Sequence, residues 1–129
     1  MFGFGYEIAG QRSSPGVPAV TMVNNFIADL SAFVAAWQGL GVDVLLMSMH
    51  PWSDEHPDGL YRDQATVLQA REAIYQVADT YDVPMIDNFA RWGSHAEALS
   101  AGFIEHFARP LPAGGWDLGR GAALALSSV

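Results

Sequence analysis

The spacing of hydrophobic residues in the first part of the chain predicts a strand followed by a helix. Residues 1–6 (MFGFGY) are apolar and aromatic, too short for a helix, and followed by a cluster of Gly, Ser and Pro. This pattern is typical of a strand that ends in a loop. Beyond Thr21, apolar side chains recur at steps of three and four residues as far as Trp37. We expect an amphipathic helix with Thr21 as its N-cap, Trp37 in its core stripe and Gly39 or Gly41 at its end.

A second strand and a second helix follow in the same order. Residues 42–49 (VDVLLMSM) form a continuous apolar run of strand length. Such a run is typical of a strand buried on both faces, and therefore of a parallel sheet. Residues 50–60 are rich in Pro, Asp and Gly, which predicts a loop. From about Asp63 to Tyr81 the helical spacing of apolar residues returns, with polar side chains on the other side.

The last part of the chain predicts a third strand and a terminal helix. Residues 83–87 read as a short strand with Pro84 near its start, and residues 88–99 as a helical turn or a short helix. Residues 102–112 are irregular, and residues 114–127 form a helix interrupted by glycines. This alternation predicts parallel strands joined by helical crossovers. We expect a single α/β domain over residues 1–129, with any ligand site beyond the carboxyl ends of the strands.

Composition narrows the classes of partner. Fourteen acidic residues face six basic ones, and the net charge of -8 disfavours binding to nucleic acid or to anionic membranes. The absence of cysteine excludes disulfides, thiolate metal sites and a cysteine nucleophile. No uninterrupted apolar run reaches the roughly 18 to 20 residues of a membrane span. The N-terminus lacks the features of a signal peptide. We therefore expect no membrane partner and a cytoplasmic or virion-associated protein.

Four blocks of the chain resemble the middle and C-terminal portion of the SGNH (GDSL-type) esterase and lipase family. They are FGFGYE at residues 2–7, GVDVLLMSMHPW at 41–52, YQVADTYDVPMIDNF at 75–89 and HFARPLPAGGWDLG at 106–119. The resemblance implies a three-layer, flavodoxin-like parallel sheet, either complete or truncated at its N-terminal edge. It also implies hydrolysis by a serine nucleophile, without a metal or another cofactor.

At the positions where the family has its site residues, this chain carries different residue types. Gly5 stands where the oxyanion-hole Asn belongs, and Tyr6 would border the same site. In the final block, His106 takes the place of the Asp and Arg109 that of the general base. An arginine cannot accept a serine's proton, because it stays protonated in proteins. His106, with Glu105 next to it, is therefore the one nearby candidate base. The Gly-Asp-Ser block that bears the nucleophile does not occur in the chain.

These residues are compatible with two classes of function. The first is an esterase-like domain for ester-bearing carbohydrate or lipid, incomplete or degenerate on its own, whose serine comes from a longer parent chain. Its partner would be a small ester or carbohydrate substrate. The second is a non-catalytic structural or binding module, for instance in a phage particle. An exposed edge on the first strand would favour self-association or pairing with a parent chain.

The loop after the central strand offers further candidates. His50 and Trp52 are expected to contact substrate, because they follow a strand end. Ser48 lacks the flanking glycines of a nucleophile elbow and is read as a core serine. Asp87, at the end of the next strand, is expected to cap a turn. Three other aromatic residues could line the same side of the sheet, although aromatic residues are more often buried: Tyr61, Trp92 and Trp116.

A metal site in this loop is a weaker hypothesis. His50, Asp54, His56 and Asp58 provide nitrogen and oxygen ligands of the kind that zinc or another divalent ion takes. Polar loops with turn-capping aspartates have the same composition. We therefore expect a solvated connection there and no metal.

Overall fold

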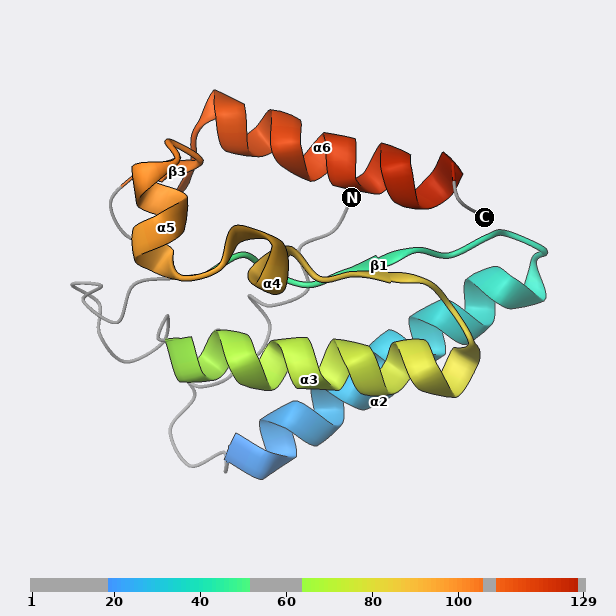
Figure 1. The fold of residues 1–129 in the computed structure, drawn as a ribbon. Helices are drawn as coiled ribbons and strands as arrows, with labels where there is room; N and C mark the ends of the chain where they lie inside the picture. The colour runs from blue at the N-terminus through green and yellow to red at the C-terminus, as the bar shows by residue number, and fades with distance from the viewer. Residues whose placement is uncertain (1–18, 52–63, 106–108, 128–129) are drawn as a thin grey trace.

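The computed structural model describes residues 19–51, 64–105 and 109–127, and these are mostly helical (Figure 1). The elements follow one another in the order α2 (Ala19–Gly39), β1 (Leu46–Met47), α3 (Gln64–Tyr81), β2 (Met85–Ile86), α4 (Asn88–Trp92), α5 (His95–Ser100), β3 (Ile104–Glu105), β4 (Arg109–Pro110) and α6 (Pro112–Ser127).

The expected three-layer, flavodoxin-like sheet is wrong for the described residues. Strands β1 and β2 form a parallel pair in which Leu46 lies opposite Met85, and β3 and β4 form a separate antiparallel pair. Each strand is two residues long. The parallel pairing stays short because Pro84 has no N–H to donate before β2, and Asp87 already caps α4 after it. The expected first strand, residues 1–6, lies outside the described residues.

The helix predictions hold in extent and fail in three details. Helices α2 and α3 cover the two predicted amphipathic stretches, and α6 covers the terminal one. However, α2 begins at Ala19, so Thr21 lies within the helix and is not its N-cap. Trp37 is 42% exposed and contacts Phe33 at a ring distance of 5.9 Å, so it is not a core residue. The segment 88–99 forms two short helices rather than one.

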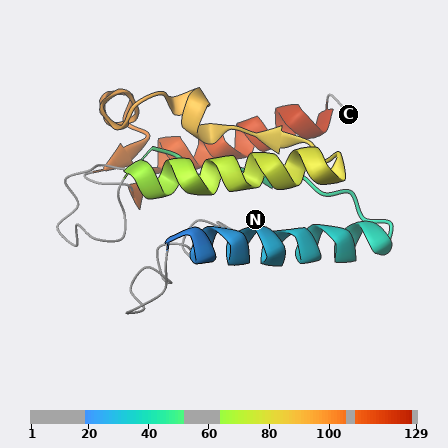
Figure 2. The ribbon, with the colours of Figure 1, turned by 90° about the horizontal axis from the view of Figure 1, so that it is seen from below.

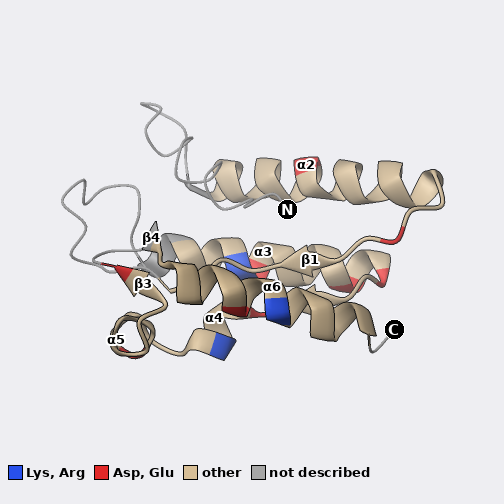
Figure 3. Ribbon diagram, turned by 90° about the horizontal axis from the view of Figure 1, so that it is seen from above, with Lys and Arg blue, Asp and Glu red and all other residues tan. Residues whose placement is uncertain are grey.

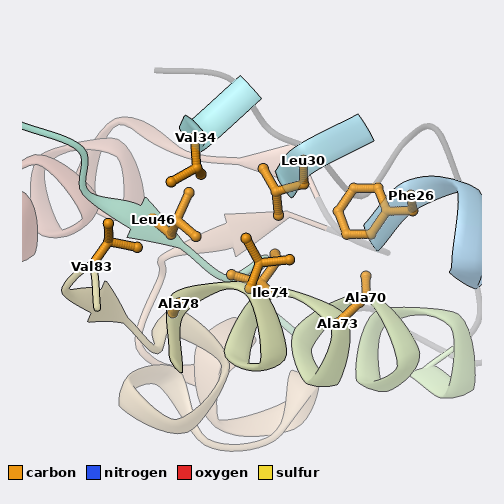
Figure 4. Packing of buried hydrophobic residues seen from close by; sticks show 10 residues of the cluster. Phe26, Leu30, Val34, Leu46, Ala70, Ala73, Ile74, Ala78 and Val83 are labelled. Atoms are coloured by element: carbon orange, nitrogen blue, oxygen red, sulfur yellow. The ribbon is translucent and has the colours of Figure 1, made fainter. Parts of the chain in front are cut away.

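The main core lies between α2, α3 and the parallel strands (Figure 4). On α2, Phe26, Leu30 and Val34 recur every four residues, which places them on one face of the helix. They pack against Ile74 and its neighbours on α3 and against Leu46 of β1. Burial of such side chains contributes roughly 1.5 to 3 kcal/mol each. The cluster therefore fixes α2 and α3 against β1.

Helix α6 lies on the other side of the parallel strands from α3 (Figures 1 and 2). A second, smaller cluster of buried residues supports this side: Trp92, Ala98 and Ile104, with Phe103 and Leu118 against them. The parallel strands thus have helices on both sides, although no extended sheet fills the space between them in the described part of the chain.

One helix has the length and composition of a membrane span. Residues 20–39, within α2, have a mean hydropathy of 1.3. Core helices and signal sequences share these properties. The sequence showed no uninterrupted apolar run of this length, because Asn24, Asn25 and Asp29 interrupt the apolar residues of α2. These three residues are exposed, whereas the opposite stripe packs on α3.

Two adjacent glycines test how closely α6 packs. A Cβ atom on Gly114 would collide with the backbone of Phe103, whereas one on Gly115 would meet nothing within 4 Å. We expect Gly114→Ala to lower the free energy of unfolding by about 1 to 3 kcal/mol. Gly115→Ala should leave it unchanged or raise it by up to about 1 kcal/mol, because alanine is the better helix former. Urea unfolding followed by circular dichroism measures both, and equal effects would contradict this packing.

Candidate functional site

Polar side chains gather where the two parallel strands end. Ser48 follows β1, and Asp87 and Asn88 follow β2. In the described part of the chain, Ser48 and Asn88 are the two buried polar residues, at 4% and 2% exposure. The carboxyl ends of parallel strands are where ligand sites lie in open α/β sheets. The location expected from the sequence therefore does hold a concentrated group of polar residues.

The carboxylate of Asp87 is the centre of this group. The guanidinium of Arg71, on α3, binds both carboxylate oxygens, with Nε 3.0 and 2.9 Å from them. The Tyr75 hydroxyl donates to the same carboxylate at 2.8 Å, and the backbone N–H of Ala90 donates at 3.1 Å. The last bond caps α4, so the predicted capping role of Asp87 is confirmed.

These contacts change the acidity of the group. Burial of Asp87 raises its pKa, but the hydrogen bonds from Arg71, from the Ala90 N–H and from Tyr75 outweigh burial and lower the pKa to about 2. The hydrogen bond to Asp87 raises the pKa of Arg71, and it also raises that of Tyr75. Asp87 is therefore an anion at neutral pH, held by a cation.

Ser48 is held by the same group of residues. Its hydroxyl lies 3.1 Å from Oδ1 of Asp87 and 3.2 Å from the carbonyl of Met49, and it accepts a bond from the Phe89 N–H at 3.2 Å. The carbonyl of Ser48 accepts from Asn88 Nδ2 at 3.0 Å. Ser48 thus joins the ends of β1 and β2, and its interpretation as a core serine is confirmed.

A second set of bonds joins this region to α6. Arg91 donates to Oδ1 of Asn88 at 2.9 Å and forms an ion pair with Asp117 at 2.9 Å. The indole N–H of Trp92 donates to the same Asp117 carboxylate at 2.7 Å. Trp92 is 4% exposed, so it is a core residue. The ring of His50 lies 5.1 Å from the ring of Trp92, which places His50 beside the strand ends.

Of the five residues that the sequence assigned to catalysis or substrate binding, His50 is the one that the structure describes with its side chain. Gly5, Tyr6, Trp52 and His106 lie outside the described residues, as do the possible metal ligands Asp54, His56 and Asp58. The described residues contain no group of three or more His, Asp or Glu side chains that could hold a metal ion.

Sequence reasoning missed Arg71 and Tyr75. Arg71 was among the polar side chains expected to face water on this helix, and Tyr75 was given no role. Their spacing of four residues puts them on one face of the helix, which was the available signal. Only the packing of α3 against the strands reveals that this face meets Asp87.

The contacts of Asp87 with Arg71 and Tyr75 stabilise the fold and are poorly suited to proton transfer. A general base works best with a pKa near the operating pH. Asp87 has a pKa far below neutrality and is engaged by Arg71 and Tyr75. It cannot activate Ser48 in the way that a histidine would.

Replacing Asp87 tests this ion pair through pH. Ionised Asp87 stabilises the fold above the pKa of the unfolded chain, about 3.8, and this contribution is lost as the pH falls toward 2. We expect Asp87→Asn to lower the free energy of unfolding by about 1 to 2 kcal/mol at pH 7, after allowance for solvent screening. The difference from the parent should shrink between pH 4 and pH 2. Urea unfolding at several pH values measures it.

The control for this experiment is Asp79→Asn, an exposed change on α3. It should leave stability nearly unchanged at every pH. A deficit of Asp87→Asn that stayed constant from pH 7 to pH 2 would show that the carboxylate's charge is not what stabilises the site.

Comparison with known proteins assigns no family or function to this site. No family model, curated protein or solved structure matches the chain. The resemblance to SGNH hydrolases therefore stays a prediction from the residues that suggested it, and function has to be argued from the described site.

Proposed function

We propose that this chain is a non-catalytic structural or binding module, the second of the two classes that the sequence left open. The observation that carries the proposal is the ion pair between Asp87 and Arg71, which fills the place at the strand ends where a catalytic group would act. In this role the polar residues fix the strand ends and do not turn over a substrate.

The state of Ser48 supports this proposal. A nucleophilic serine needs a base within hydrogen-bond reach and access to a substrate carbonyl. Ser48 is 4% exposed, and its hydroxyl is engaged by Asp87 and by the Phe89 N–H. Asp87 in turn faces the cation of Arg71. Such a serine contributes to stability through satisfied hydrogen bonds and is shielded from a substrate.

The surface of the chain also fits a module that binds other molecules. Trp116 on α6 is 82% exposed, and Leu124 and Leu126 on the same helix are each 59% exposed. Large aromatic side chains such as Trp are enriched at protein interfaces. The binding role therefore has a candidate surface on α6, away from Asp87.

An esterase-like domain stays the second candidate, because one observation favours it. Ser48, His50 and Asn88 lie at the carboxyl ends of parallel strands, where hydrolytic sites of α/β proteins are built. An intact site of this kind would need a serine of this chain as its nucleophile and His106 as its base. The two candidates then differ in whether any serine of the purified chain reacts.

Hydrolysis of p-nitrophenyl acetate and butyrate, together with a serine-reactive fluorophosphonate probe, separates the two candidates. We expect no turnover above the uncatalysed rate and no probe labelling, with Ser48→Ala and His106→Ala indistinguishable from the parent. The proposal would be wrong if the parent were labelled and turned over ester, and if His106→Ala abolished both.

A further inference from the structure

A pocket lies at the end of the fold opposite Asp87. It is at the amino ends of the two parallel strands, between the segment that leads into β1 and the turn that leads into β2. Its volume is about 590 Å³. Sites for small molecules occupy roughly 300 to 1,000 Å³, so the pocket has the size of a ligand site.

The walls of this pocket are largely apolar. Six of its described lining residues have apolar side chains: Val42, Val44, Leu45, Val83, Pro84 and Leu126. Such walls bind the hydrocarbon part of a ligand, because contact removes apolar surface from water. They suit a bare metal ion poorly, since metal ions take several oxygen or nitrogen ligands. The described residues also contain no group of three His, Asp or Glu side chains that could provide them.

Three helices end at the pocket. Gln38 lies in the last turn of α2, Asp82 follows α3, and Leu126 lies in the last turn of α6. Figure 1 shows the C-terminal ends of these helices on the same side of the fold. The C-terminus of a helix carries a partial negative charge of about half an elementary charge, which a basic residue in the last turn can offset. None of the three helices has a basic residue in its last turn.

Two carboxylates add to this negative charge. Asp43 and Asp82 both line the pocket and are exposed. Neither carboxylate forms an ion pair or a hydrogen bond with another described residue. The described lining contains no basic residue that would neutralise them. In Figure 3 the described ribbon at this end carries acidic positions in red and no basic position in blue.

Hydrogen bonds hold the walls of the pocket in place. The side-chain amide of Gln38 donates to the carbonyl of Tyr81 at 3.0 Å, which joins the ends of α2 and α3. The N–H of Val83 donates to the carbonyl of Ala78 at 3.0 Å and fixes the turn after α3. The pocket is therefore formed before any ligand arrives, as most small-molecule sites are.

We propose that this pocket binds a small organic cation, an ammonium group carried on an apolar body. The ammonium group lies beside Asp43 and Asp82, and the hydrocarbon packs against Val44 and Leu126. A positive charge is the one that the helix ends and the carboxylates attract. The site goes beyond the proposed function and does not depend on it, because it lies at the opposite ends of the strands from Asp87.

Titration with hexylammonium chloride tests the site, with the shifts of the backbone amide signals followed by NMR. We expect saturable shifts at residues 41–45 and 82–84. Hexan-1-ol and hexanoate have the same hydrocarbon chain but no positive charge. Both should bind at least about tenfold more weakly, because the helix ends and the carboxylates no longer attract them.

Charge-neutralising variants locate the cation. Asp43→Asn and Asp82→Asn should each raise the dissociation constant of hexylammonium about two- to fivefold, the size of one exposed ion pair. Asparagine accepts the positive φ of 51° at Asp82, so the turn is retained. Asp29→Asn, an exposed change on α2, removes the same net charge elsewhere and should bind like the parent.

Three outcomes would overturn the proposal. Absence of saturable shifts at residues 41–45 and 82–84 would show that the pocket does not take the cation. Equal affinity for hexan-1-ol and hexylammonium would show that the pocket selects for apolar character alone. Equal weakening by Asp29→Asn and Asp82→Asn would show that the cation responds to the net charge of the chain. All three are independent of ester hydrolysis, which has its own assay.

Discussion

The carboxylate of Asp87 is the interaction on which the described structure depends most. It follows β2, caps α4, receives two side chains from α3 and contacts Ser48 beyond β1. In a larger sheet the backbone hydrogen bonds of several strands would position these elements. Here the parallel strands are two residues each, so few such bonds exist. The ion pair with Arg71 and its neighbouring hydrogen bonds therefore supply much of the orientation that a sheet would otherwise provide.

A second carboxylate, that of Asp117, joins α6 to this centre. It binds Arg91 and the indole of Trp92, and both of these lie on α4, the helix that Asp87 caps. The approach of α6 is close because glycines face inward. A helix that docks through glycines and one ion pair leaves its bulky residues outside. The exposed Trp116 is thus a consequence of how α6 is held.

The main helices could be predicted from the sequence because their signal is local. The stripe of Phe26, Leu30 and Val34 repeats with the period of a helix, and a helix of this length needs no distant partner to define its face. Strands depend on partners far away in the chain. The apolar run at residues 42–49 has strand-like composition, yet only Leu46 and Met47 find a ladder among the described residues. The length of the sheet was therefore overestimated, because composition alone does not distinguish a paired strand from a buried extended segment without a partner.

By itself, the sequence determined where helices α2, α3 and α6 run, that Asp87 would cap a turn and that Ser48 would be buried, because spacing and flanking residues decide these features locally. Only the tertiary structure decided that Arg71 and Tyr75 meet Asp87, and that Trp116 faces outward while Trp92 faces inward. These outcomes depend on how whole helices pack against each other. A side chain's own sequence neighbourhood does not record which face of its helix will be covered.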